Sequence, residues 1–208
     1  MNGPIGNSYW VVPDKLLAGK YPGAIDARDS RKKLTAIVDA GIRSFVDLTE
    51  RHELERYDDG LRSLARERTL DLRYARFPIV DVSTPTPDEM TRIVEHVSSE
   101  IAVGRPVYVH CRGGIGRTGT VVGCWMVQEE GRRPDDALAR IADLRSGLPG
   151  ISPETDDQCA FVREWGGSTR ATAGERRTCQ DRAQAVPIFC EQTRFPFFRL
   201  STQSLSQG

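Results

Sequence analysis

A cysteine and an arginine lie six positions apart in a glycine-rich stretch, HCRGGIGRTG at residues 110–119. Cys111 supplies a thiol nucleophile, and Arg117 supplies a planar guanidinium that can hold two oxygens of one phosphate group. The spacing alone is weak evidence, because a chain with five cysteines and 25 arginines readily contains such a pair by chance. The three glycines between the two residues make it stronger, since glycine lets the backbone approach a ligand closely.

The segments on either side of this stretch give the pair a chemical meaning. An apolar strand pattern at 107–109 precedes it, and an apolar helix pattern from about 117 to 130 follows it. A loop between a strand and a helix can turn its N–H groups toward one point, and the helix N-terminus adds positive potential there. The sequence therefore predicts a cradle for a tetrahedral anion, formed by Arg112, Gly113, Gly114, Ile115, Gly116 and Arg117.

Within this cradle we expect Cys111 at the base, where the positive potential favours the thiolate, which is the nucleophilic form. The hydroxyl of Thr118 is placed to hydrogen-bond the sulfur and help it leave in a second step. His110 is expected to fix the loop through hydrogen bonds rather than to act as a base. A nucleoside triphosphate loop is a poorer interpretation, because its Gly-Lys-Ser/Thr signature is missing.

Helix and strand patterns alternate along the first 165 residues, which predicts an α/β domain. Thr86, Pro87 and Glu89 form a helix start with a capping box. The expected strands are 10–12, 16–19, 44–48, 73–77 and 107–109. The expected helices lie around 34–38 and 61–65, after Thr86 to about 104, and at 117–130, 134–145 and 153–165, the last capped by Ser152.

Composition indicates the extent of the domain and excludes some classes of partner. We expect a phosphate-processing domain at 1–165 and a flexible or poorly ordered tail at 166–208, which is rich in Arg, Gln and Ser. The 29 basic and 29 acidic residues balance, which argues against nucleic acid as a partner. No apolar run is long enough for a membrane span, and the N-terminus lacks a secretion signal. The five scattered cysteines argue against a disulfide framework and a structural zinc site, so we expect the reducing cytoplasm. We also expect a monomer.

The stretch at 110–119 resembles the His-Cys-x5-Arg-Thr signature of protein tyrosine and dual-specificity phosphatases. The similarity extends over roughly 8–165, includes Leu48-Thr49-Glu50, and is greatest to the small atypical dual-specificity phosphatases. It implies a cysteine phosphatase fold with a central, mostly parallel sheet of four to five strands flanked by helices. It also implies a cysteinyl-phosphate intermediate on Cys111 and a phosphorylated protein or peptide substrate, with neither cofactor nor metal.

Such a reaction needs a general acid, because a phenolate or alkoxide leaves poorly without a proton. The resemblance assigns this role to Asp81, about 30 residues before Cys111 and at the start of a loop rich in Ser, Thr and Pro. From spacing alone, Asp81 fits a turn residue equally well. Asp88 is a rival that is better explained as a first-turn helix charge, and Asp47 is a weaker one inside an expected strand.

Two further residues are expected to support the site. The resemblance implies that Gln158 positions water for the second step, although a solvated helix residue fits that position equally well. Glu50 is expected to orient a loop residue or to contact the substrate.

Phosphotyrosine requires a deep pocket, whereas phosphoserine and phosphothreonine need a shallow one. The chain has no obvious counterpart of a deep-pocket recognition loop, so we expect a shallow site of dual-specificity type. Because shallow sites still tend to process phosphotyrosine, we expect phosphotyrosine as substrate, with phosphoserine and phosphothreonine as further ones. The strongest rival is a phosphoinositide phosphatase, whose loops often carry two basic residues. Here Arg112 fits one of them, but Ile115 occupies the place of the second. A phosphate-binding module without turnover is another alternative, yet Cys111, Arg117 and Asp81 are all present. A sulfurtransferase or an arsenate reductase would also place a cysteine in an anion loop.

Overall fold

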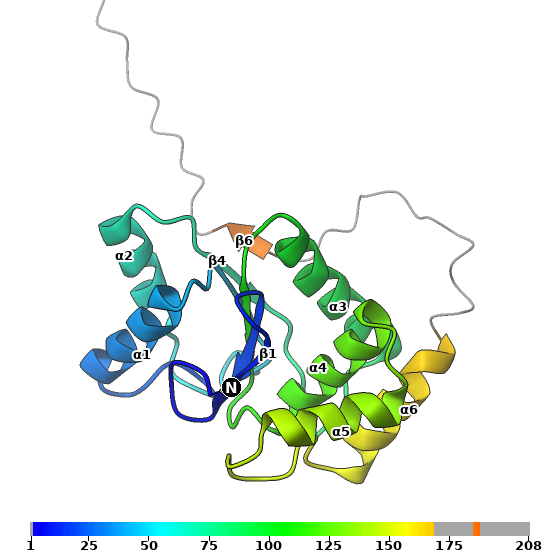
Figure 1. Ribbon diagram of the computed structural model, residues 1–208. Helices are drawn as coiled ribbons and strands as arrows, with labels where there is room; N and C mark the ends of the chain where they lie inside the picture. Colours follow the sequence, from blue (N-terminus) through cyan, green and yellow to red (C-terminus); the bar gives the residue numbers. More distant parts are fainter. Residues whose placement is uncertain (1, 169–184, 188–208) are drawn as a thin grey trace, which may run out of the picture.

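The computed structural model describes residues 2–168 and 185–187 of the 208-residue chain. It has three layers, with a central sheet between two groups of helices (Figure 1). The strands are β1 (Ser8–Val12), β2 (Leu16–Gly19), β3 (Ser44–Asp47), β4 (Arg73–Arg76), β5 (Val107–His110) and β6 (Ala185–Pro187). The helices are α1 (Ala27–Asp39), α2 (Asp58–Arg68), α3 (Pro87–Ala102), α4 (Gly116–Glu129), α5 (Pro134–Leu144) and α6 (Asp156–Ser168).

The sheet has the order β1-β2-β5-β3-β4-β6, and its four central strands, β2, β5, β3 and β4, run parallel to one another. Strands β1 and β6 pair antiparallel at the two edges. The predicted mostly parallel α/β sheet is confirmed, and β6 adds a strand from beyond the expected domain. Because parallel strands end at the same edge of a sheet, the loops that follow β2, β3, β4 and β5 meet there.

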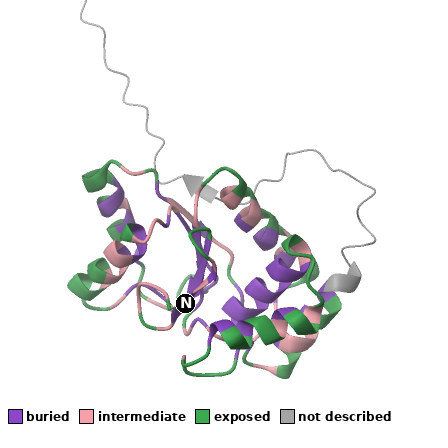
Figure 2. Ribbon diagram, in the orientation of Figure 1, coloured by how far each residue is buried: buried purple, intermediate pink, exposed green. Residues whose placement is uncertain are grey.

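Each face of the sheet packs against its own helices, and the buried residues gather on the sheet and on these helices (Figure 2). Side chains that point alternately to the two faces of the sheet divide the core into two clusters. On one face, α1 and α2 bury apolar side chains such as Leu34 and Leu61 in a cluster with Phe45 and Tyr108. On the other face, α3 to α6 share a larger cluster that contains Val109. Helix α4 is buried from its first residue to Val127, so the loop that enters it is anchored in the core.

The helix ends show where local sequence rules hold. The Thr86 hydroxyl accepts a hydrogen bond from the Glu89 amide, and the Glu89 carboxylate accepts one from the Thr86 amide, as predicted. The expected start of the last helix was wrong by three residues, because a reciprocal pair between Thr155 and Gln158 caps α6. The expected cap, Ser152, donates its hydroxyl hydrogen elsewhere, as described below.

Helix α6 continues to Ser168, three residues beyond the expected domain end. Apart from that end of α6 and β6, the predicted tail at 166–208 lies outside the described residues. Within the described part of the chain, no helix combines the length and the apolar character that a membrane crossing requires.

Candidate active site

The loop at residues 111–117, which we call the phosphate loop, connects β5 to α4 and depends on two glycines. Gly114 has φ of 71°, and a Cβ atom there would lie 2.3 Å from the backbone carbonyl carbon of Gly19. A Cβ atom on Gly116 would lie 2.8 Å from Oε1 of Gln158. A larger residue at either position would therefore collide with the end of β2 or with α6.

The carbonyl groups of the phosphate loop are bound on its outer side. The carbonyl of Arg112 accepts from the Tyr21 amide at 3.1 Å, and that of Gly114 accepts from Nη1 of Arg145 at 2.8 Å. The carbonyl of Ile115 accepts from the Ser152 hydroxyl at 2.8 Å. A trans peptide points its N–H away from its carbonyl. The amides that follow these carbonyls therefore face the inner side of the loop, as an anion cradle requires.

Cys111 and Arg117 both lie in the interior of the site. Cys111 is 3% exposed and is a free cysteine. Nη1 of Arg117 donates to Glu53 at 2.7 Å and to the Ile79 carbonyl at 3.0 Å, and Nη2 donates to Glu53 at 2.7 Å. Burial lowers the pKa of Arg117, but Glu53, Cys111 and Asp81 outweigh it and raise the pKa. The guanidinium is thus a fixed positive charge close to the sulfur.

Glu53, which sequence reasoning missed, forms a bidentate ion pair with Arg117. Its hydrogen bond from Arg117 is the main cause that lowers its pKa. Glu50, the residue expected here, is exposed and donates its backbone N–H to Glu53 at 3.1 Å. The turn holds glutamates at 50, 53 and 55, and no local pattern distinguishes them.

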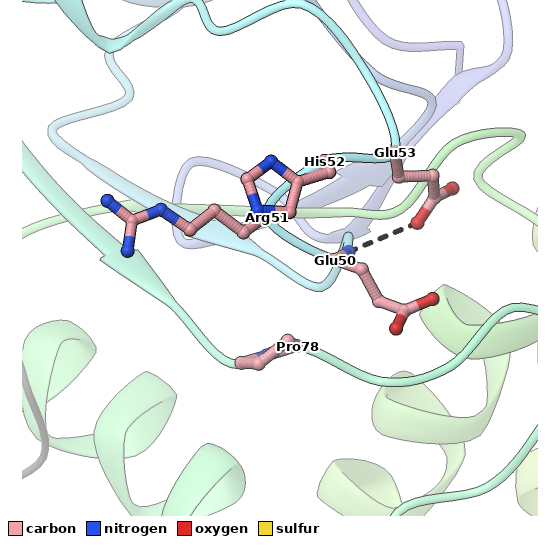
Figure 3. Close-up of a pocket in the computed structure, with 5 residues that line it drawn as sticks. All are labelled: Glu50, Arg51, His52, Glu53 and Pro78. Carbon is pink, nitrogen blue, oxygen red and sulfur yellow. Dashed lines mark hydrogen bonds between the residues drawn. The ribbon is translucent and has the colours of Figure 1, made fainter.

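Glu50 and Glu53 also line a hollow of about 550 Å³ beside the site (Figure 3). Its other lining residues are Arg51, His52 and Pro78.

Asp81 follows β4 in the loop at residues 77–86, which we call the acid loop. Its Oδ1 lies 2.8 Å from Nη2 of Arg117, and its side chain is 45% exposed. The next residue, Val82, has φ of 60°, which is uncommon for a β-branched residue, and it donates its N–H to Asp81 at 3.1 Å. Among the three candidate acids, Asp81 is therefore the one that contacts Arg117, and its side chain remains partly exposed to solvent.

The two rival acids lie in other surroundings. Asp88 is exposed in the first turn of α3, where it complements the helix dipole. Asp47 is fully buried and accepts hydrogen bonds from Thr49, Tyr74 and Arg76. Burial raises the pKa of Asp47, but the nearby His110 and the hydrogen bonds outweigh it, so the pKa stays below its ordinary value.

His110 is the last residue of β5 and is fully buried. Its Nε2 lies 2.6 Å from the Tyr57 hydroxyl, and its Nδ1 lies 3.9 Å from Asp47. Burial lowers the pKa of His110, and the negative charge of Asp47 opposes this only in part. The hydrogen bond to Tyr57 fixes the imidazole at the end of β5, directly before the phosphate loop.

Gln158 and Thr118 complete the set of predicted residues. Gln158 is fully buried rather than solvated, and its Nε2 donates to the carbonyl of Ser83 in the acid loop at 3.1 Å. Its Oε1 accepts from the Glu154 and Thr155 amides. Gln158 therefore connects the acid loop to the start of α6. Thr118 is also fully buried, and its hydroxyl has no hydrogen-bond partner among residues 2–168 and 185–187.

Residues 114–119, GIGRTG, also fit the Gly-x-Gly-x-x-Gly spacing of dinucleotide-binding loops. That fingerprint needs a second strand with an acidic residue about 20 positions further on. Here the residues about 20 positions further on belong to α5, so the fold does not supply the partner strand. The glycines serve the phosphate loop described above.

Comparisons with known proteins find similar chains among phosphatases. The chain is 28% identical over 128 residues to phosphatidylglycerophosphatase and protein-tyrosine phosphatase 1 of Rattus norvegicus, covering 61% of this chain and 63% of that protein. It is 26% identical over 145 residues to tyrosine-protein phosphatase cdc-14 of Caenorhabditis elegans, covering 68% of this chain and 19% of that protein. The chain thus spans less than two thirds of either relative.

Among solved structures, Tk-PTP in the active form has the same fold, with a TM-score of 0.62 and 21% identity. The match covers 78% of this chain and 97% of Tk-PTP. A family model described as "Tc-R-P: Polymorphic toxin system, DSP-PTPase phosphatase" matches residues 19–131, more than half of the 208 residues. The chain therefore belongs to the DSP-PTPase phosphatase family of polymorphic toxin systems.

Proposed function

We propose that this chain is a cysteine-dependent phosphatase that hydrolyses phosphate monoesters through a cysteinyl-phosphate intermediate. One observation carries the proposal. Asp81 of the acid loop contacts Arg117 at the start of α4, and Cys111 lies at the other end of the phosphate loop, directly after β5. This arrangement supports Cys111 as the nucleophile, Arg117 as the charge clamp and Asp81 as the proton donor for phosphoryl transfer to a thiol.

In the first step, the Cys111 thiolate attacks phosphorus and the bond to the ester oxygen breaks. Asp81 gives its proton to the departing oxygen, so a neutral alcohol or phenol leaves. The inward amides of the phosphate loop and the Arg117 guanidinium bind the equatorial oxygens, where negative charge gathers in the transition state. Glu53 supports this step by holding the guanidinium plane.

In the second step, water attacks the phosphocysteine, Asp81 takes a proton from the water, and the sulfur leaves as a thiolate. Thr118 stabilises that thiolate, since its buried hydroxyl has a hydrogen to offer. The contacts of Gln158 support a role in holding the acid loop in place for both steps, in addition to the predicted role with water. His110 holds the start of the phosphate loop, and Glu50 holds Glu53 through its backbone.

The substrate that we propose is a phosphorylated protein or peptide, with phosphotyrosine first and phosphoserine and phosphothreonine after it. The relatives named as tyrosine phosphatases support this choice. We propose that residues 1–165 form the phosphatase domain and that 166–208 form a separate tail. We also propose a monomer in the cytoplasm, where a reducing medium preserves a reactive thiol.

Hydrolysis of an aryl phosphate by wild type and by Cys111→Ser tests the proposal, with release of phosphate as the readout. We expect the variant to lose measurable turnover while still binding tungstate. Equal rates in the two proteins would refute the nucleophile. Tungstate binding without turnover in wild type would indicate a phosphate-binding module instead of an enzyme.

A second candidate is a lipid phosphomonoester, because the rim of the site is apolar. Within the described residues, five large apolar side chains are exposed. Val80 and Val82 flank Asp81 in the acid loop, and Ile151 follows Gly150, where a Cβ atom would lie 2.8 Å from Cδ1 of Ile115. Ile25 lies on the loop between β2 and α1. The rat relative is named a phosphatidylglycerophosphatase as well as a protein phosphatase. Turnover of a phosphotyrosine peptide against phosphoinositide in mixed vesicles separates the two, and a large preference for the lipid would overturn the peptide proposal.

A further inference from the structure

Arg145 is a second buried arginine next to the phosphate loop, and the proposed reaction does not use it. It caps the C-terminus of α5 and is 3% exposed. Its Nη1 donates to the Gly114 carbonyl at 2.8 Å, and its Nη2 donates to the Pro149 carbonyl at 2.7 Å. Its guanidinium carbon lies 5.4 Å from the centroid of the Tyr9 ring.

The environment of Arg145 is unusual for a buried charge. Within the described residues it pairs with two carbonyls and an aromatic face, and no carboxylate lies within ion-pair distance. A buried cation without a carboxylate partner is costly to desolvate. A helix cap alone needs no such charge, because the last carbonyls of α5 can be satisfied by water or by the chain itself.

The carbonyl that Arg145 binds belongs to the peptide between Gly114 and Ile115, in the middle of the phosphate loop. Gly114 has a positive φ, so it is the residue at which the loop turns. With the Gly114 carbonyl held outward, the N–H of Ile115 points to the inner side of the loop, where the proposed phosphate would bind. A charged donor on a carbonyl also polarises the peptide, which strengthens the hydrogen bond that its N–H donates.

We propose that Arg145 is a positioning residue for the phosphate loop. Its hydrogen bond to the Gly114 carbonyl keeps the Ile115 amide pointing toward the bound oxyanion. Its hydrogen bond to the Pro149 carbonyl connects the segment after α5 to the phosphate loop. This inference deepens the proposed function and rests on it for turnover, but the predicted effect on oxyanion binding is independent of turnover.

The test compares tungstate binding by calorimetry in wild type, Arg145→Met and Arg145→Lys, using the full chain. We expect Arg145→Met to weaken tungstate binding about tenfold or more, the size of a lost charge-assisted hydrogen bond. Arg145→Lys should restore part of the affinity, because one ammonium keeps the charge but does not span both carbonyls. With an aryl phosphate, KM should rise along with a fall in kcat.

Two control variants on the same helix separate positioning from stability. Arg140→Met removes an exposed charge of α5, and Ile141→Ala removes buried contacts one turn before Arg145. Urea unfolding shows how far each variant is destabilised. We expect Ile141→Ala to lower the urea midpoint and leave the tungstate affinity of the folded protein unchanged, while Arg140→Met changes neither.

Wild-type tungstate affinity in Arg145→Met, or the same loss in Ile141→Ala, would overturn the positioning role and leave the phosphatase proposal standing. If wild type binds tungstate without hydrolysing any ester and Arg145→Met loses that binding, the positioning role is supported and the phosphatase proposal fails.

Discussion

Asp81 and an incoming phosphate compete for the same part of Arg117. The Asp81 carboxylate lies 2.8 Å from Nη2, whose other contact is Glu53 at 2.7 Å. Nη1 is already used by Glu53 and by the Ile79 carbonyl. A phosphate that binds Nη2 must therefore displace Asp81 or share the nitrogen with it. We predict that Asp81→Asn binds oxyanions more tightly than wild type although it is a poorer catalyst.

The two effects have opposite signs and different sizes. The Asp81 side chain is 45% exposed, so its ion pair with Arg117 lies in the range of about 0.2–1 kcal/mol typical of surface pairs. Removing a competitor of that strength tightens oxyanion binding by up to about fivefold. Loss of general acid catalysis lowers kcat by about 10²- to 10⁴-fold.

The assay measures the inhibition constant of tungstate and the value of kcat for two aryl phosphates with good and poor leaving groups. The kcat loss in Asp81→Asn should be larger for the poor leaving group, since a phenolate that is stable without a proton needs the acid less. Asp88→Asn is the matched control, because it removes an exposed carboxylate a few residues further on. It should leave both quantities unchanged.

Weaker tungstate binding in Asp81→Asn would show that the carboxylate assists the anion site rather than competing for it. Full activity in Asp81→Asn together with lost activity in Asp88→Asn would move the acid role to Asp88. Either result would refute the reasoning from the contact with Arg117.

Three further perturbations test the surroundings of the site. Glu53→Gln should lower the free energy of unfolding by about 1–3 kcal/mol in urea, because it weakens a buried charge-assisted pair, and an unchanged midpoint would contradict this. Gly114→Ala should destabilise the chain by roughly 1–3 kcal/mol because of its positive φ and the close backbone of its neighbour, whereas Gly113→Ala, whose Cβ would lie 3.6 Å from the nearest atom, should be tolerated. Burial holds the pKa values of His110 and His96 below their ordinary value, so the unfolded chain takes up protons first as pH falls below about 6.5. The free energy of unfolding should then fall by up to about 1.4 kcal/mol per pH unit for each group. The measurement compares the fall in urea midpoint between pH 7.5 and 5.5 in His96→Gln and in the double variant His96→Gln/His110→Gln, and the double variant should show the smaller fall. Equal falls in the two variants would exclude a contribution from His110.

The features predicted from sequence are those set by short-range patterns. The strand at β5, the glycine turn and the apolar helix α4 are consecutive in the chain, so the phosphate loop could be located without knowing the fold. The capping box at Thr86 is local in the same sense. Asp81 was found because it starts a polar loop after a strand, with the resemblance deciding between it and its rivals.

The residues that sequence reasoning missed make long-range contacts. Glu53 lies 64 residues from Arg117, and Arg145 lies 31 residues from Gly114. Nothing in the local pattern distinguishes Glu53 from its two neighbouring glutamates, or Arg145 from other arginines near helix ends. Ser152 shows the converse error, since its sequence favours a helix cap while the fold uses its hydroxyl on the carbonyl of Ile115.

The apolar rim and the bond-breaking groups are physically separate, which bears on how such a protein can change over evolution. The side chains of Ile25 and Val80 are exposed, whereas those of Cys111 and Arg117 are buried in the core. Substitutions on the rim can alter which molecules are accepted at little expense in folding stability, while the machinery below stays the same. A single scaffold of this kind could therefore diversify its targets quickly, one exposed side chain at a time.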